Sequence, residues 1–324
     1  MQKFFLAIIL AHLFFSLASC QTYTQWFGPP FIVQTLPLFN QRTDVVSGTK
    51  KSWKGDWIFR RKRLNLVDEE INKKSPNIVF FQELMKKNNK SDSDSIILEY
   101  SSLAYHKPFT FSYQKYEETG EEEFAATYVR MGNYSVDADD QYVLEKLKQG
   151  GYFVFQKILL DQVPFYLINV KMGDGPVAEG FLELQEKIKK HLDGVKKCYN
   201  QILVAGHFKG QTNHPSFIRF LKTFDLVDSA WDFCEMNKNC YTESQSNPIL
   251  NSSTVENKIY RSERILTHKT SKIDQSEIAF EKEEKTLNNL KKEYHLNTIT
   301  PSIRYGWQAK ISFGICLNKK EKKK

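Results

Sequence analysis

Two short segments of this chain end in side chains suited to phosphate or metal chemistry. The segment NIVFFQEL, residues 77–84, carries Glu83, and ILVAGHFKG, residues 202–210, carries His207 and Lys209. A carboxylate is a hard oxygen ligand for Mg²⁺, an imidazole is a general base or a transition-metal ligand, and an ammonium group holds anions. Hydrolysis of a phosphodiester with Mg²⁺ needs ligands for the ion, a base for the attacking water and a cation for the developing charge.

Each of these side chains also has a structural interpretation. Glu83 is a metal ligand if the chain is active, and otherwise an acid that pairs with lysines. His207, as a single histidine at a strand end, is commonly a hydrogen-bonded structural residue. Lys171 and Lys209 are candidates for binding an anion, with ordinary ion pairing as the alternative. We expect a salt-bridged pocket without a metal, because a lysine close to Mg²⁺ repels it by about 4 kcal/mol or more at an effective dielectric of about 20.

Apolar runs and amphipathic stretches alternate along the chain and predict the elements that position these residues. Strands are expected, from β-branched and aromatic runs bounded by turn residues, at 78–82, 150–160, 164–172, 201–208 and 305–317. Helices are expected at 60–73, 179–197, 216–224 and 274–295. The helix at 179–197 places apolar residues at core spacing, and the one at 274–295 is expected to be charged and exposed. This mixed order predicts an α/β layered domain.

The order of the motifs resembles the endonuclease/exonuclease/phosphatase superfamily, and within it the neutral sphingomyelinases and the inositol polyphosphate 5-phosphatases. NIVFFQEL resembles the strand that delivers a metal-binding glutamate, and GGYFVFQKIL and FYLINVKM resemble two sphingomyelinase strands. LVAGHFKG resembles a Gly-Asp-Phe-Asn strand, and IYRSERIL resembles a Cys-Asp-Arg-Ile-Leu segment. The resemblance covers residues 44–315 and implies a four-layer sandwich of two mixed β-sheets flanked by helices.

Several positions that the resemblance maps onto catalytic residues hold other residue types in this chain. Glu83 matches the metal-binding glutamate. The metal-linked asparagine at the end of the family's opening strand falls on Thr49, and the histidine that grips the phosphate falls on Lys171. The aspartate and the asparagine of the Gly-Asp-Phe-Asn strand fall on His207 and Lys209.

The last two motifs are altered as well. Glu263 replaces the aspartate before a matching Arg-Ile-Leu, and the closing Ser-Asp-His falls on Gly306, Trp307 and Gln308. The closing motif therefore keeps neither its acid nor its general base. The resemblance implies an inherited hydrolase fold whose catalytic residues are lost or rebuilt.

We therefore expect a catalytically inactive phosphodiesterase fold that acts as a structural or binding subunit. No cofactor is expected, and the partner would be an unidentified protein or an anionic ligand. One alternative is an active, Mg²⁺-dependent phosphodiesterase similar to neutral sphingomyelinase, using Glu83, Glu263 and His207. The other is a non-enzymatic binder of phosphate or a lipid headgroup, using Lys171 and Lys209.

Residues 1–20 are typical of a secretory signal peptide. They contain one charge, at Lys3, then an apolar run and the small-residue cleavage site Ala18-Ser19-Cys20. We expect a secreted or luminal protein. The same site also fits a bacterial lipobox, which would attach a lipid to Cys20.

The remaining chain divides into an extended lead-in at 21–43, the hydrolase-like domain at 44–317 and a basic tail at 318–324. The formal net charge is +8, and it is concentrated in the tail and in residues 50–63. Nucleic acid is not expected as a partner, because these are two local clusters rather than a basic groove. The tail would allow peripheral contact with an anionic membrane surface.

Cysteines and sequons favour an oxidising compartment. Once the signal is removed, four cysteines permit two disulfides, and they are Cys198, Cys234, Cys240 and Cys316. The local pair Cys234–Cys240 is the preferred bridge, and no Cys-x-x-Cys spacing supports a zinc site. Glycosylation sequons, which favour a eukaryotic secretory protein, stand at Asn89, Asn133 and Asn251.

Overall fold

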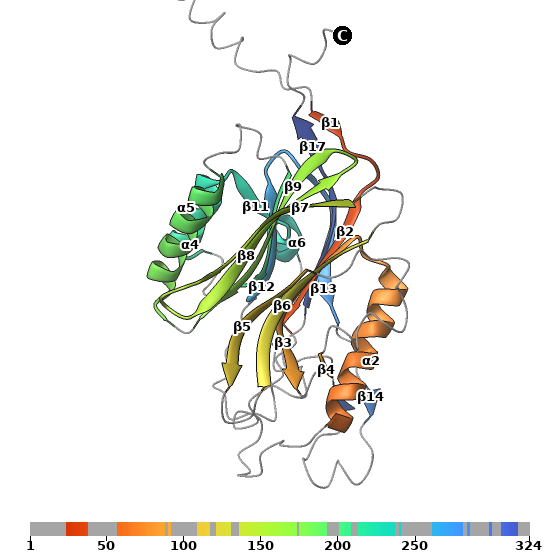
Figure 1. The fold of residues 1–324 in the computed structure, drawn as a ribbon. Helices are drawn as coiled ribbons and strands as arrows, with labels where there is room; N and C mark the ends of the chain where they lie inside the picture. The colour runs from red at the N-terminus through yellow and green to blue at the C-terminus, as the bar shows by residue number, and fades with distance from the viewer. Residues whose placement is uncertain are drawn as a thin grey trace, which may run out of the picture.

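The computed structural model describes most of the chain between residues 24 and 316. The described residues are 24–37, 57–87, 90–91, 109–116, 121–130, 136–173, 175–192, 201–208, 213–236, 240, 261–280, 284–285, 298–299 and 306–316. They form two β-sheets that face each other, with helices on the outer face of each sheet (Figure 1). The expected four-layer α/β architecture is therefore confirmed.

The first sheet has six strands in the order β11-β12-β10-β9-β8-β7. In that order the strands are Leu226–Asp228, Glu263–His268, Ile202–His207, Val163–Met172, Gly151–Leu160 and Val136–Lys146. β9 and β10 run parallel, and the other neighbours are antiparallel. The expected strands at 150–160, 164–172 and 201–208 are thus three adjacent strands of one sheet.

The second sheet has seven strands, six of them in the order β13-β16-β2-β3-β6-β5, with β4 paired to β3. In that order, with β4 last, they are Lys272–Ala279, Gly306–Ser312, Phe31–Pro37, Ile78–Lys87, Glu121–Val129, Phe109–Tyr116 and Lys90–Ser91. Two further pairs join β1 (Thr24–Trp26) to β17 (Gly314–Cys316) and β14 (Glu284–Lys285) to β15 (Thr298–Ile299).

Helices α4 (Val177–Leu192) and α5 (Pro215–Thr223) cover the first sheet on the side opposite to α2 (Figure 1). The residues expected at core spacing on α4 are all buried, namely Phe181, Leu184, Ile188 and Leu192. α5 begins where the His214 side chain accepts the Ser216 N–H and Pro215 takes the first turn. These contacts explain why the two amphipathic stretches became docked helices.

Helix α2 (Trp57–Lys74) covers the outer face of the second sheet. Leu64, Val67 and Ile71 of α2 pack in one cluster with Val79 and Phe81 of β3. The short helix α6 (Trp231–Met236) follows β11. None of the described helices is long and apolar enough to cross a membrane.

The segment 21–43, expected as a lead-in outside the domain, contributes an internal strand. β2 lies between β16 and β3, and Val33 and Leu36 are fully buried. The domain boundary at residue 44 therefore needs correction, because β2 belongs to the second sheet. The three prolines and the aromatic residues of this segment indicate a packed arm rather than a paired strand.

The prediction of a helix at 274–295 is also wrong for those of its residues that the structure describes. Lys272–Ala279 is strand β13, paired along its length with β16. Ser276 and Ala279 are buried, and Ile278 packs against the core between the sheets. Pairing with β16 and burial therefore outweigh the helical charge pattern in this segment. The signal peptide, the basic tail and the sequons lie outside the described residues.

Candidate functional site

A row of four polar side chains crosses the first sheet at one end of the space between the sheets. Tyr152 on β8 pairs with Lys171 on β9, Lys171 pairs with His207 on β10, and His207 pairs with Glu263 on β12. Directly paired residues project from the same face of a sheet. On β10 that face also carries Leu203, which belongs to the core between the sheets. The row therefore lines a polar end of the inter-sheet interior.

The second sheet supplies two acids to this row. The Nζ atom of Lys171 lies 3.1 Å from Oε1 of Glu83 on β3 and 2.6 Å from Oε1 of Glu123 on β6. The side chains are largely buried, with 17% of Lys171, 9% of Glu83 and 7% of Glu123 exposed. One ammonium group thus bridges two carboxylates across the two sheets.

The electrostatics of the cluster follow from this geometry. Burial disfavours the charged form of Lys171, but the carboxylates of Glu83 and Glu123 outweigh it and raise the pKa of Lys171 above its usual value. The pKa of Tyr152 is raised well above its usual value by burial and then by the nearby charge of Glu123. At neutral pH, Lys171 is therefore a cation and Tyr152 a neutral phenol.

A β-bulge places Glu83 in the interior. The register of β3 against β6 shifts between Phe81 and Leu84, and Glu83 adopts a left-handed φ of 58°. In a regular strand, consecutive side chains point to opposite faces, whereas here Gln82 and Glu83 both reach groups on the first sheet. The Glu83 N–H donates to the Tyr152 hydroxyl at 3.4 Å.

Asn169 holds the bulge from the opposite sheet. Its Oδ1 accepts from Gln82 at 2.7 Å, and its Nδ2 donates to the carbonyl oxygens of Phe81 at 3.1 Å and Ala126 at 3.2 Å. Gln82 also exchanges hydrogen bonds with Thr35. These buried polar groups are satisfied by one another, which fixes the spacing of the two sheets beside Glu83.

His207 and Glu263 form a buried pair at the other end of the row. His207 Nδ1 lies 2.9 Å from Glu263 Oε1, and the Ser262 hydroxyl donates to Glu263 Oε2 at 2.6 Å. An ionised Glu263 carboxylate only accepts hydrogen bonds, so the matching tautomer of His207 donates through Nδ1. Glu263 thus orients the imidazole of His207. Both oxygens of the Glu263 carboxylate already accept hydrogen bonds, one from His207 and one from Ser262.

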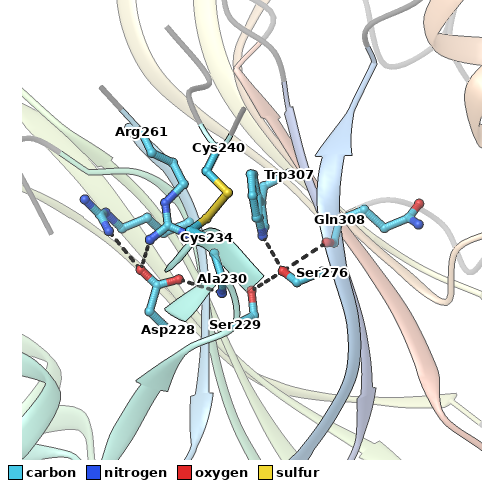
Figure 2. A network of polar contacts seen from close by, with 10 residues as sticks. Asp228, Ser229, Ala230, Cys234, Cys240, Arg261, Ser276, Trp307 and Gln308 are labelled. Carbon is cyan, nitrogen blue, oxygen red and sulfur yellow. Dashed lines mark hydrogen bonds and ion pairs between the residues drawn. A yellow bond between two sulfur atoms is a disulfide. The ribbon is translucent and has the colours of Figure 1, made fainter. Parts of the chain in front are cut away.

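Gln308 does not join this row. Its side chain accepts from Gln34 at 2.7 Å and donates to Glu277 at 2.8 Å. Glu277 also pairs with Lys74 of α2, so Gln308 faces the outer, α2-covered side of its sheet. Trp307 points the other way and is buried, with its ring N–H donating to Ser276 at 2.7 Å (Figure 2). The side chain of Gln308, a predicted site residue, therefore lies on the outer face of the second sheet, whereas Lys171 lies in the space between the two sheets.

The strand expected near Thr49 lies outside the described residues, and β2 is the described strand that precedes α2 in the sequence. β2 precedes α2, runs parallel beside β3, and ends at Pro37 opposite Gln82. Pro37, which has no polar side-chain atom, occupies the strand end next to Glu83. Thr49 and Lys209 lie outside the described residues.

The described residues do not fit a magnesium ion. Glu83, which maps onto the metal-binding glutamate, and its neighbour Glu123 both contact the Lys171 ammonium group, and the neighbouring strand end is a proline. Within the described parts of the chain, no group of three or more His, Cys, Asp or Glu side chains could hold a metal. Magnesium prefers several oxygen ligands in an octahedral arrangement, which this cation-bearing cluster does not offer.

Sequence reasoning missed Glu123, Tyr152 and Asn169 as members of the cluster. Glu123 lies in the run EEEF, where three successive acids give no indication of which one faces inward. Tyr152 and Asn169 lie inside motifs already singled out, and strand alternation from Lys171 would have found Asn169. The expected disulfide Cys234–Cys240 is present, whereas Cys198 lies outside the described residues.

No family model and no curated protein matches this sequence. Solved structures do match its fold. The mannosyl-6-phosphatase Bt3783 of Bacteroides thetaiotaomicron is 14% identical, with a TM-score of 0.57 over 87% of this chain and 99% of its own. An endonuclease/exonuclease/phosphatase family protein of the same organism is 14% identical, with a TM-score of 0.59 over 89% of this chain and 99% of its own.

The human Nocturnin catalytic domain, solved with a bound sulfate anion, is 14% identical, with a TM-score of 0.57 over 91% of this chain and 99% of its own. At such identities the likeness concerns the fold. The chain therefore has the phosphatase- and nuclease-type fold of endonuclease/exonuclease/phosphatase structures.

Proposed function

We propose that this protein uses a phosphatase- and nuclease-type fold without metal-dependent hydrolysis, as a binding or structural subunit. The observation that supports the proposal most directly is the Lys171 ammonium group between Glu83 and Glu123. In a magnesium hydrolase, carboxylates gather around a divalent cation; here two carboxylates gather around a side chain of the protein itself.

The charge balance favours this interpretation. At 4 Å and an effective dielectric of about 20, a unit charge repels another like charge by about 4 kcal/mol, and a divalent ion by about twice that. A magnesium ion beside Glu83 would meet this repulsion from Lys171. It would also have to draw both carboxylates away from an ammonium group that already neutralises them in part.

The alternative of a rebuilt hydrolase receives less support. Glu263 and His207 contact each other on the first sheet, whereas Glu83 contacts Lys171. The carboxylate of Glu263 also accepts from Ser262. The three residues of that alternative are thus engaged in two separate ion-pair groups.

An anion-binding role for Lys171 is also less favoured. The Lys171 ammonium group already contacts the carboxylates of Glu83 and Glu123, so fewer of its three N–H donors are left for a phosphate. We therefore infer that the partner is a protein surface rather than a phosphate held at Lys171. The Cys234–Cys240 disulfide supports the proposal of a secreted or luminal location.

A hydrolysis assay with a matched variant tests the proposal. The full chain is incubated with millimolar Mg²⁺ and three substrates: bis(p-nitrophenyl) phosphate, sphingomyelin and a phosphorylated inositol. We expect no turnover above that of Glu83→Gln. Turnover by the unaltered chain that disappears in Glu83→Gln would overturn the proposal.

A further inference from the structure

The disulfide Cys234–Cys240 lies against a buried charge network. Cys234 belongs to α6, and both cysteines are half-buried beside the apolar core between the sheets. Figure 2 shows the sulfur bridge next to Arg261 and Trp307. The Arg261 guanidinium lies 5.1 Å from the centre of the Trp307 ring, so a cation and an aromatic ring pack beside the bridge.

Arg261 contacts one sulfur of the bridge directly. Its Nη1 donates to Cys234 Sγ at 3.7 Å, while its Nη2 donates to Asp228. Among the described residues, the hydrogen bond of Arg261 reaches Cys234 Sγ rather than Cys240 Sγ. The two sulfurs of the bridge therefore have different electrostatic surroundings.

Arg261 keeps positive charge available for that sulfur. Burial lowers the pKa of Arg261 to about 10, which leaves it protonated at neutral pH. Its acidic partner, Asp228, is shared with Arg264, whose Nη1 donates to the same oxygen at 2.8 Å. The Asp228 carboxylate is thus shared by two guanidinium groups, and Glu263 adds a second negative charge that acts on Arg261.

We infer that Cys234–Cys240 is a thiol–disulfide exchange site in which Arg261 makes Cys234 the leaving group. The co-reactant is a small thiolate or dithiol. A thiolate next to an arginine is stabilised, and the better-stabilised thiolate leaves faster from a disulfide. This inference does not depend on the proposed function.

The exchange is balanced as follows. An external thiolate attacks Cys240 Sγ, a new sulfur–sulfur bond forms there, and the Cys240–Cys234 bond breaks. The electron pair of that bond stays on Cys234 Sγ, whose thiolate accepts the Arg261 hydrogen bond. With a dithiol, its second thiolate attacks the mixed disulfide, so that Cys240 leaves as a thiolate and the dithiol is oxidised to a cyclic disulfide.

The first experiment identifies the attacked sulfur. The oxidised full chain is treated briefly with glutathione, quenched with N-ethylmaleimide, and mapped by peptide mass spectrometry. We expect glutathione on Cys240 and maleimide on Cys234. An equal distribution, or glutathione mainly on Cys234, would overturn the inference, and so would a bridge that does not react.

The second experiment measures thiolate stabilisation after reduction with a phosphine. Iodoacetamide pulses between pH 5 and pH 9 give a rate for each cysteine, because peptide mapping separates them. We expect the midpoint of the Cys234 profile at least about one pH unit below that of Cys240. At pH values below both midpoints, Cys234 should react about threefold faster than Cys240 for each pH unit by which its midpoint is lower. The larger thiolate fraction of Cys234 outweighs the lower nucleophilicity of that thiolate.

Matched variants assign the effect to Arg261. Arg261→Gln should remove the difference between the cysteines, Arg261→Lys should restore part of it, and Arg219→Gln, an exposed change on α5, should leave it intact. If Arg261→Gln does not fold, the comparison of the two cysteines in the unaltered chain still decides. Equal midpoints for Cys234 and Cys240 would contradict the inference.

Discussion

At the scale of single residues, the central feature is Lys171, which contacts Glu83 and Glu123 of the opposite sheet. A buried ion pair adds little net stability over an apolar replacement, but removal of one partner leaves uncompensated buried charge. For Lys171 the charge left behind would be that of two carboxylates facing each other. Each charged side chain of this cluster therefore depends on the others for its compensating charge.

Lys171→Met should therefore lower the free energy of unfolding by about 3–5 kcal/mol, measured by urea denaturation at neutral pH. The triple variant Lys171→Met, Glu83→Gln, Glu123→Gln should recover a large part of this loss, because no charge remains on these three side chains. Divalent cations should stabilise Lys171→Met more than the unaltered chain. A loss below about 1 kcal/mol in the single variant would contradict the assigned ion pairs.

The same cluster predicts how stability changes at alkaline pH. The pKa of Lys171 is raised in the folded state, so its contribution is fully present below the ordinary lysine value of about 10.4 and is lost as pH rises through the folded pKa. Between pH 7 and pH 9 this ion pair should therefore leave stability unchanged. This is one reason to measure Lys171→Met at neutral pH.

At the scale of elements, Glu145 on β7 fixes the last turns of α4 to the sheet. Its carboxylate accepts from Lys187 at 2.6 Å and lies 2.6 Å from Nε2 of His191, whose ring stacks on Phe155. Burial opposes ionisation, but the hydrogen bonds from Lys187 and His191 prevail and lower the pKa of Glu145. Helix α4 is thus held by charge as well as by its apolar face.

The lowered pKa gives Glu145 a pH-dependent contribution to stability. That contribution is present above the ordinary glutamate pKa of about 4.3 and is lost as pH falls through the folded value. We expect the unaltered chain to be more stable than Glu145→Gln near neutral pH, and the difference to shrink as pH falls below the ordinary glutamate pKa and through the lowered folded pKa. Urea denaturation across this pH series measures it, and a difference independent of pH would refute the role of the carboxylate.

The turn between β8 and β9 is a second element whose energetics can be tested. Asp161 and Gln162 connect the two strands with φ values of 49° and 67°. Two left-handed residues are typical of a type I′ turn, in which glycine is favoured at the second position. Gln162→Gly should raise the free energy of unfolding by about 1 kcal/mol, whereas Gln162→Val should lower it. Equal melting temperatures for the two variants would argue against this turn.

The elements that could be predicted from sequence were those with strong local patterns. The periodicity of α4 and the apolar runs of β8, β9 and β10 identified their structures and close boundaries. β2 and β13 were missed because their strand character depends on pairing with β16, which lies far away in the sequence. The charge pattern around β13 indicated a helix, and the prolines around β2 indicated an extended arm. Both indications are wrong.

At the scale of the whole molecule, the two sheets bring together residues that the sequence keeps far apart. The motif order predicted the layered fold, and it placed Glu83 and Lys171 in one site, where the structure has them in contact. The partner Glu123 and the outward position of Gln308 could not be predicted, because they depend on strand register and on which sheet face a residue occupies. One residue of shift in a strand reverses that face.

The most direct test of the central claim is a calorimetric titration of Mg²⁺ into the full chain, with Glu83→Gln as the matched control. Because Lys171 already occupies the carboxylates that would hold the ion and would repel it, we predict only heats of dilution up to millimolar Mg²⁺ for both proteins. Saturable binding of one magnesium ion by the unaltered chain, abolished in Glu83→Gln, would contradict the account.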